Sequence, residues 1–506
     1  MKQLFQWVMA ATLICGLSVF TACSSGSDDN QEPVVKPDPV VNPDPDDNGA
    51  NSSSSEIGYI ECSWNGSEVV KTPKVAKAIN LASEVTGTGW EKELPAGVYY
   101  VSGYLSVTDF FVIKGGSKVD IILCDGAELK VPCLRMKGSG TRLRIFGQEN
   151  GTGSLTTKSD LIGMYSGIGA QYSVSDAGYD LEFHGGIITA YGSVSSTADG
   201  AGIGKGFNSI TIYGGTINAT GGEEDAAGIG GGENDTSGII TIYGGTVTAQ
   251  GGENAAGIGG GDGKSVSSIN IHGGTVYAYA GVDGAGIGGG EDGDSGDILI
   301  TGGTVYAYGD RKSDGSSNKG YGAGIGSGQN GNVNTIIIKG GDVQAYGGMD
   351  AAGIGTGEEY GSDINSGTIE IHGGKVWAEG KGYGAGIGCG EDATFGVLGI
   401  SGGRVDAHAG SDCGPWSGGI GAYHKDHGAD DNCHIGWAGW ERIYIAKGMR
   451  LWTYSPNVGS IETVTNNLPW WNYVHQRPQA AFDVCDHPGY TEATCPFCYR
   501  ETLQLQ

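Results

Sequence analysis

The sequence predicts an all-β fold, a right-handed parallel β-helix of stacked glycine-rich coils with a cap at each end. Three observations indicate this fold. One phrase recurs along the chain, most often with a step of 29 residues, as from Ile258 to Ile287. Each repeat contains three short apolar stretches that alternate with period two, which is typical of strands. The chain has 506 residues and 98 glycines, roughly three times the usual share of glycine.

The repeat itself justifies three strands per coil. In one unit the apolar stretches are Ile240-x-Ile242, Val247-x-Ala249 and Ala256-Gly257-Ile258, and glycines stand at the junctions. Glycine allows the tight corners that such short strands require. A unit this short cannot bury its apolar side alone, so successive units must stack to form a core. A propeller is the alternative, but its blades need about 40 residues and four longer strands.

The first residues predict export and lipid anchoring. Lys2 is followed by an apolar run from Leu4 to Phe20 and then by Thr21-Ala22-Cys23. A charged start, an apolar run and a small residue before the cut are typical of a secretory signal. We therefore expect residues 1–22 to be a lipoprotein signal peptide and Cys23 to carry acyl chains such as palmitate. The alternative is an ordinary signal in which this cysteine has no role.

The remaining chain divides into four predicted parts. Residues 23–56 are rich in Pro, Asp and Ser, which predicts an extended tether. Residues 57–105 do not repeat and predict an N-terminal cap. Residues 106–455 carry the repeats, and residues 456–506 predict a C-terminal cap with a Cys/His knuckle. Caps are expected because the ends of a stack of strands need cover.

The charge of the chain restricts its partners. The formal net charge is −28. A strongly acidic chain is a poor ligand for nucleic acid and for anionic lipid surfaces. We expect no nucleic-acid partner, and the charge is compatible with divalent cations.

The alternation assigns side chains to the outside of the coil. Where Val and Ala of the Val-x-Ala stretch point inward, the residues between and after them point outward. These outward positions gather aromatic residues, which predict a flat platform for sugar rings. The alternative is that tyrosine is a good exposed strand residue that pairs with its like. The candidate ligand-binding residues are Tyr191, Tyr277, Tyr279, Tyr306, Tyr308, Tyr346 and Trp377.

Two further features suggest metals. Carboxylates recur in the turns, for example Asp262, Glu291-Asp292 and Glu358-Glu359. Rows of carboxylates suit Ca²⁺, and solvated turns are the alternative. In the tail, four side chains have the spacing of a structural Zn²⁺ knuckle, although exported thiols usually form disulfides. These candidate zinc ligands are Cys485, His487, Cys495 and Cys498. Cys413 and Cys433 could form a disulfide across the loop between them. Alternatively, a metal could be held by Cys413, His424, His427, Asp430, Asp431, Cys433 and His434.

Several segments resemble known families. The runs Ile121–Leu129, Leu143–Gly147 and Gly151–Leu155, followed by Ala-Gly-Ile-Gly repeats, resemble the carbohydrate-binding-domain β-helix proteins of anaerobic bacteria. The resemblance covers roughly residues 100–455 and implies a parallel β-helix, polysaccharide binding and calcium. The stretch Ser24–Asn30 resembles the acidic tether of surface-exported lipoproteins of Bacteroides-type bacteria. Together they imply an outer-membrane lipoprotein exposed at the cell surface.

The favoured functional hypothesis is a non-catalytic lipoprotein that binds an extracellular polysaccharide or glycan. An adhesin or structural protein that contacts other proteins is the second hypothesis. A polysaccharide lyase or glycoside hydrolase is the third hypothesis. Such enzymes need paired carboxylates on one strand face, or a calcium site beside a basic residue that takes the proton. The nearest constellation is Arg404, Asp406 and His408 beside Glu379, and exposed strand residues are the alternative explanation.

Overall fold

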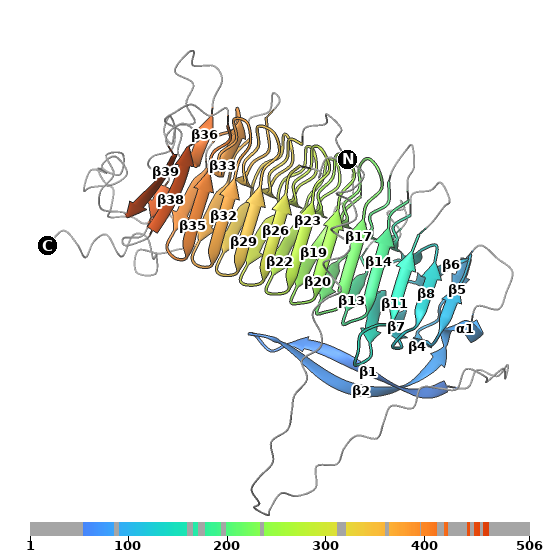
Figure 1. Cartoon of the computed structure of the whole chain (residues 1–506). Coiled ribbons are helices and arrows are strands. Elements are labelled where there is room, and N and C mark those ends of the chain that lie inside the picture. The colour runs from blue at the N-terminus through green and yellow to red at the C-terminus, as the bar shows by residue number, and fades with distance from the viewer. Residues whose placement is uncertain are drawn as a thin grey trace, which may run out of the picture. The chain divides into compact units, whose positions relative to one another are not determined.

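The computed structural model describes residues 54–84, 91–158, 165–170, 178–193, 199–232, 237–310, 320–359, 364–394, 396–411, 419–423, 443–445, 450–455 and 459–464. Within these ranges the strands form three sheets of 14, 13 and 12 strands (Figure 1). We name them sheet A, sheet C and sheet B, respectively. The short helix α1 (Leu81–Glu84) is the one helix among the described residues, and no described helix has the length and apolarity of a membrane span.

Each sheet takes every third strand of the repeats. Sheet A contains β1 (Ser54–Trp64), β2 (Val69–Asn80), β4 (Gly97–Val101), β7 (Lys118–Leu123), β10 (Arg142–Gly147), β13 (Asp180–Phe183), β16 (Ser209–Ile212), β19 (Ser237–Ile242), β22 (Val266–Ile271), β25 (Asp297–Ile300), β28 (Thr335–Ile338), β31 (Thr368–Ile371), β34 (Val397–Ile400) and β37 (Ile443–Ile445). Sheet C contains β5 (Tyr104–Ser106), β8 (Glu128–Val131), β11 (Ser154–Thr157), β14 (Ile187–Tyr191), β17 (Thr216–Thr220), β20 (Thr246–Gln250), β23 (Thr275–Tyr279), β26 (Thr304–Tyr308), β29 (Asp342–Tyr346), β32 (Lys375–Glu379), β35 (Arg404–His408), β38 (Arg450–Ser455) and β39 (Gly459–Val464). Sheet B contains β3 (Glu91–Glu93), β6 (Phe110–Lys114), β9 (Leu134–Lys137), β12 (Ile168–Gly169), β15 (Ile203–Gly204), β18 (Ile229–Gly230), β21 (Ile258–Gly259), β24 (Ile287–Gly288), β27 (Ile325–Gly326), β30 (Ile354–Gly355), β33 (Ile387–Glu391) and β36 (Ile420–Tyr423).

Successive coils pair in parallel with equivalent positions of the repeat in register. Ile240 of β19 pairs with Ile269 of β22, and Ile258 of β21 pairs with Ile287 of β24. The longer step from Ile287 to Ile325 keeps the same pairing. The prediction of a right-handed parallel β-helix with three strands per coil is therefore confirmed.

The core is a continuous column inside the coils. In β20 the sequence Thr-Val-Thr-Ala-Gln buries only Val247 and Ala249, and both are fully buried. Ile258 of sheet B and Ile240 of sheet A are also fully buried. Burial of such an isoleucine stabilises the fold by roughly 2–3 kcal/mol. The inward and outward positions follow the predicted period-two alternation.

Two columns of glycine stand at positions of the coil where a side chain would collide with the backbone of a neighbouring coil. Gly259 has a φ of +143°, and a Cβ at this position would lie 1.9 Å from the carbonyl oxygen of Gly288 in the next coil. Gly245 has a φ of +88°, and its Cβ would lie 2.7 Å from the carbonyl oxygen of Gly215. Both contacts are with backbone atoms, so larger residues would push successive coils apart.

The first described strands form a hairpin along the outer face of sheet A. β1 and β2 pair antiparallel over eleven positions, from Ser54–Ile79 to Trp64–Val69, and β2 joins β4 through Ile79 and Asn80 (Figure 1). A cap is expected to cover only the first coil. This hairpin extends further, to the coil that contains His272. The coils begin with β3, β4 and β5, inside the predicted cap of residues 57–105.

An aromatic column of sheet A anchors this hairpin. Rings stack from Phe146 through His184, Tyr213 and Tyr243 to His272, with centroids 4.4–5.2 Å apart. Trp64 at the tip stacks on Tyr243 and His272, at 4.9 and 5.7 Å. Tyr59 contacts Phe146, and the Cys62 amide donates to Nδ1 of His184 at 3.1 Å. These aromatic residues therefore hold the hairpin on the coils.

Candidate functional site

The tyrosines of β23 and β26 form two ladders on the outer face of sheet C. Both strands read Thr-Val-Tyr-Ala-Tyr, and because Val and Ala are buried the tyrosines face outward. Tyr277 stacks on Tyr306, with centroids 5.0 Å apart and planes within 4°. Tyr279 stacks on Tyr308 at 5.0 Å. All four side chains remain half-exposed.

Two more candidate residues extend this surface. Tyr346 of β29 stacks on Tyr308 at 5.0 Å and lengthens the second ladder to three rings. Trp377 of β32 stacks on His408 at 3.8 Å, and its indole N–H donates to the Glu379 carboxylate at 3.2 Å. We call the surface of Tyr277, Tyr279, Tyr306, Tyr308, Tyr346 and Trp377 the tyrosine face.

Tyr191 is the candidate that the structure does not bring to the tyrosine face. It lies in the same column of sheet C, but Thr220 and Gln250 of the next two coils separate it from Tyr279. Its side chain is 39% exposed, and the Lys158 ammonium lies 5.7 Å from its ring centroid.

The ladder geometry determines which groups can meet a ligand. The face-to-face stacking occupies ring faces inside each ladder, so ring faces are open only at ladder ends, and the ring edges and hydroxyls line the outside. Burial and neighbouring tyrosines raise the pKa of Tyr308 to about 12. Burial also raises the pKa of Tyr279 and Tyr346. These three phenols are therefore protonated at neutral pH and can donate hydrogen bonds.

The carboxylates beside the tyrosine face contact cations or the indole. Lys375 pairs with Asp342 at 3.2 Å, and Arg404 pairs with Asp406 at 3.0 Å. Asp406 is only 5% exposed, and Glu379 accepts the hydrogen bond from Trp377. The constellation around Arg404, Asp406 and His408 thus presents an ion pair beside an imidazole that stacks on Trp377.

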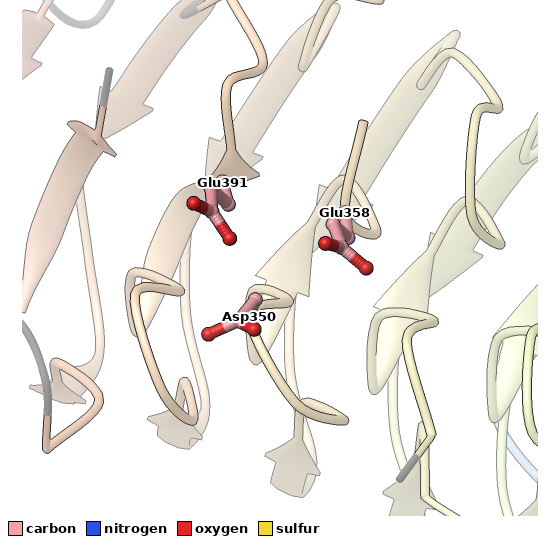
Figure 2. Close-up of side chains that lie close together, drawn as sticks. All are labelled: Asp350, Glu358 and Glu391. Carbon is pink, nitrogen blue, oxygen red and sulfur yellow. The ribbon is translucent and has the colours of Figure 1, made fainter. Parts of the chain in front are cut away.

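Acidic turns meet at one corner of the coil. Asp350 follows β29, Glu358 follows β30, and Glu391 ends β33 of the next coil, and one carboxylate oxygen of each lies within 4.8 Å of the others. Figure 2 shows these three carboxylates beside one another. The donor set consists of hard oxygen atoms, which are the ligands of Ca²⁺. The three side chains therefore fit the cation that the sequence suggests for the acidic turns.

The same corner concentrates negative charge over several coils. Burial, together with Glu291, Glu253 and Glu358, raises the pKa of Asp283 to about 7. Burial and neighbouring carboxylates also raise the pKa of Glu291. Like charges at short range oppose ionisation, and a bound cation would relieve that repulsion.

A chain of hydrogen bonds on sheet A escaped the sequence analysis. His372 follows β31, and its Nε2 lies 2.9 Å from the Glu370 carboxylate. Its Nδ1 lies 2.8 Å from the hydroxyl of Ser401, which follows β34 in the next coil. The sequence carries a signal for this arrangement, since Ser401 stands 29 residues after His372, one repeat step.

Other predicted sites lie outside the described residues. These are the signal peptide, the lipidation site Cys23, most of the tether, the zinc candidates Cys485, His487, Cys495 and Cys498, and the cluster from Cys413 to His434. Four other cysteines, Cys62, Cys124, Cys133 and Cys389, are buried free thiols.

Comparison with known protein families supports the architecture. Segments of the chain match a family model described as a beta helix repeat, at residues 210–233, 240–262, 269–291, 298–329, 336–358 and 364–391. Each segment runs from sheet A through the strand of sheet B. The search of curated proteins and the search of solved structures returned no match. The repeat match and the three parallel sheets identify the chain as a right-handed parallel β-helix protein.

Proposed function

We propose that the protein is a carbohydrate-binding protein whose tyrosine face binds an extracellular polysaccharide without acting on it chemically. The observation that carries this proposal is the pair of half-exposed tyrosine ladders side by side on one sheet. Sugars offer apolar C–H faces and hydroxyl groups, and the tyrosine face offers ring edges, end rings and a row of phenols.

Rigidity favours binding on this surface. The tyrosines project from strands whose inner residues, such as Val276 and Ala278, are fully buried. The stacking at 5.0 Å fixes the rings relative to one another. A ligand would therefore order few side chains on binding, which lowers the entropic cost of association.

A divalent cation is part of the proposal, bound at the corner of the coil where Asp350, Glu358 and Glu391 meet, which we call the acidic corner. Asp350, Glu358 and Glu391 would hold Ca²⁺. The cation would supply positive charge that links two successive coils. We further propose that Cys23 anchors the protein in the outer membrane and that the tether presents the coils at the cell surface.

The test is binding of the purified protein to a panel of insoluble polysaccharides and to a glycan array. We expect retention on at least one glycan and a loss of affinity of about tenfold or more, about 1.4 kcal/mol, for the double variant Tyr277→Ala, Tyr306→Ala. Tyr104→Ala is the matched control, because Tyr104 is a 66% exposed tyrosine of sheet C outside the ladders.

Three outcomes would change the proposal. Absence of binding to every glycan would remove it and favour the adhesin hypothesis. Unchanged binding of the double variant would move the site away from the tyrosine face. Release of reducing ends or unsaturated products would favour the lyase or hydrolase hypothesis. Repeating the assay with a chelator, and again after Ca²⁺ is restored, shows whether the acidic corner contributes.

A further inference from the structure

We propose that Ser401, His372 and Glu370 form a nucleophilic centre that hydrolyses esters. The Ser401 hydroxyl lies 2.8 Å from Nδ1 of His372, and Nε2 of His372 lies 2.9 Å from the Glu370 carboxylate. Both distances are within the range expected for a nucleophile, its general base and a third group that orients the base. This site lies on sheet A and is separate from the tyrosine face on sheet C.

The two hydrogen bonds determine the tautomer of His372. An ionised carboxylate can only accept, so the Glu370 contact places the imidazole proton on Nε2. Nδ1 then carries the lone pair and accepts the hydrogen bond from the Ser401 hydroxyl. This is the protonation state that a general base needs before it takes a proton from a serine.

The backbone holds the three groups on rigid elements. Glu370 belongs to β31 and His372 follows it directly, while Ser401 follows β34, the next strand of sheet A. The Glu370 side chain is 3% exposed and the His372 side chain is 16% exposed. Ser401 is half-buried, and Gly399, opposite Glu370, adds no side chain beside the hydroxyl. The nucleophile therefore lies nearer to solvent than the group that orients the base.

Two other coils provide internal comparisons. Nδ1 of His272 also lies 2.8 Å from a hydroxyl, that of Thr301, but the position of Glu370 is occupied there by Asn270. His184 lies 3.4 Å from Glu182, but the next coil places Tyr213 rather than a serine beside it. Within the described coils, the hydroxyl, the imidazole and the carboxylate meet only at Ser401, His372 and Glu370. A histidine at this position of the coil is therefore not sufficient to bring a hydroxyl and a carboxylate to the same imidazole.

The reaction that this arrangement supports is acyl transfer to water. Ser401 Oγ attacks the ester carbonyl carbon while His372 takes the hydroxyl proton, and His372 then returns this proton to the departing alcohol oxygen. Water attacks the resulting acyl-serine, gives one proton to His372, and the proton returns to Ser401 as the carboxylic acid leaves. The substrate class is therefore an ester with an accessible acyl group.

The test combines hydrolysis of p-nitrophenyl acetate with fluorophosphonate labelling of the full-length protein. We expect a covalent adduct on the peptide that contains Ser401, located by mass spectrometry. We also expect Ser401→Ala and His372→Gln to lower kcat at least a hundredfold. Thr301→Ala is the matched control and keeps the wild-type rate, since Thr301 belongs to the coil without the carboxylate.

Glu370 acts as a positioning residue, and its variants separate this role from a structural one. Glu370→Gln should lower kcat at least tenfold with KM unchanged, and Glu370→Asp should restore part of the rate. Wild-type protein without an adduct at Ser401, or Ser401→Ala with unchanged kcat and a native melting curve, would overturn the proposal. Glycan binding by the tyrosine face is measured in a separate assay. A negative result for ester hydrolysis therefore does not bear on the proposal that the tyrosine face binds glycan.

Discussion

Histidine occupies the same outward column of sheet A in three described coils, and its neighbours differ each time. His184 contacts the backbone of Cys62 in the hairpin. His272 lies under Trp64, and burial lowers its pKa. His372 joins Ser401 and Glu370. At the residue scale, the repeat fixes where a side chain points, and the residues one coil away decide what it can do.

Asp283 makes the stability of the protein depend on pH. Its pKa is about 7 in the folded protein, because of burial and nearby carboxylates, and about 3.9 in an unfolded chain. A raised carboxyl pKa means that this group favours the folded state most below about pH 4, and the benefit is lost as the pH rises to about 7. We expect Asp283→Asn to stabilise the protein at pH 8 by about 1 kcal/mol, after allowance for solvent screening.

Thermal unfolding between pH 4 and pH 8 measures this effect. The variant and the wild type should have the same melting temperature below about pH 4, diverge progressively between about pH 4 and about pH 7, and keep a constant difference above about pH 7. Asp297→Asn, which removes an exposed carboxylate of β25, is the control. Parallel melting curves for Asp283→Asn and the wild type across the whole range would contradict the prediction.

At the scale of elements, the hairpin β1–β2 has a strand edge whose backbone N–H and C=O groups are largely unpaired with another strand among the described residues. β2 joins β4 only through Ile79 and Asn80, so the rest of its outer edge has no strand partner among the described residues. Pro73 lacks an amide donor, and Lys71, Lys74 and Lys77 are exposed. Proline and lysine on an edge discourage pairing with another chain. The hairpin is thus attached by side chains on one side and protected from strand addition on the other.

Trp64→Ala tests how the hairpin is held. The substitution removes two ring contacts, with Tyr243 and His272, which are worth about 1–3 kcal/mol together. We expect faster amide hydrogen exchange in β1 and β2 while the coils keep their protection. The pKa of His272 should rise toward its ordinary value because the ring becomes hydrated. Val75→Ala, at a 69% exposed position, is the control and should leave both quantities unchanged.

At the scale of the whole molecule, one coil can be exchanged for the next because the pairing is identical. Ile240 stands in the place of Ile269, and Val247 in the place of Val276. Stability in such a stack is approximately a sum over coils and their interfaces. The hairpin breaks this equivalence, since it spans the coils up to His272. Among the described residues, the ring contacts that anchor its tip end at His272.

Removal of single coils should therefore have position-dependent effects. Deletion of residues 240–268 joins Ile239 to Ile269 and places His272 and Thr301, instead of Tyr243 and His272, beneath Trp64. Deletion of residues 336–368 joins Thr335 to Ile369 and leaves these contacts unchanged. We expect both proteins to fold and only the first to lose hydrogen-exchange protection in β1. Equal protection of β1 in both proteins would contradict this expectation.

The coils were predictable from sequence because the pattern that forms them is local and repeated. The alternation around Ile240, Val247 and Ile258 gives the strands, and the glycines give the corners. Repetition also aligned the columns, so that the tyrosine positions could be assigned before any coordinates. What the tyrosines bind stays a prediction, because stacking within a ladder and stacking on a sugar favour the same residues.

Contacts between distant segments were not predictable in this way. Cys62 and His184 are 122 positions apart, and β1 and β2 have no counterpart elsewhere in the repeat. The proximity of Glu370, His372 and Ser401 could have been predicted from the sequence, because the repeat step places Ser401 beside His372. Their significance depends on hydrogen-bond distances that a repeat alignment does not contain.

The course of β1 along the coils has a mechanical consequence. The chain enters β1 at Ser54, which pairs with Ile79 beside the first coil, and turns back after Trp64. A force applied to the segment before Ser54, and directed away from Trp64, would load β1 in shear. The hydrogen bonds between β1 and β2 would then share the load, whereas a force applied at Ser54 across the strands would open them one after another. The hairpin is therefore placed to resist a pull that acts on Ser54 along the direction of β1.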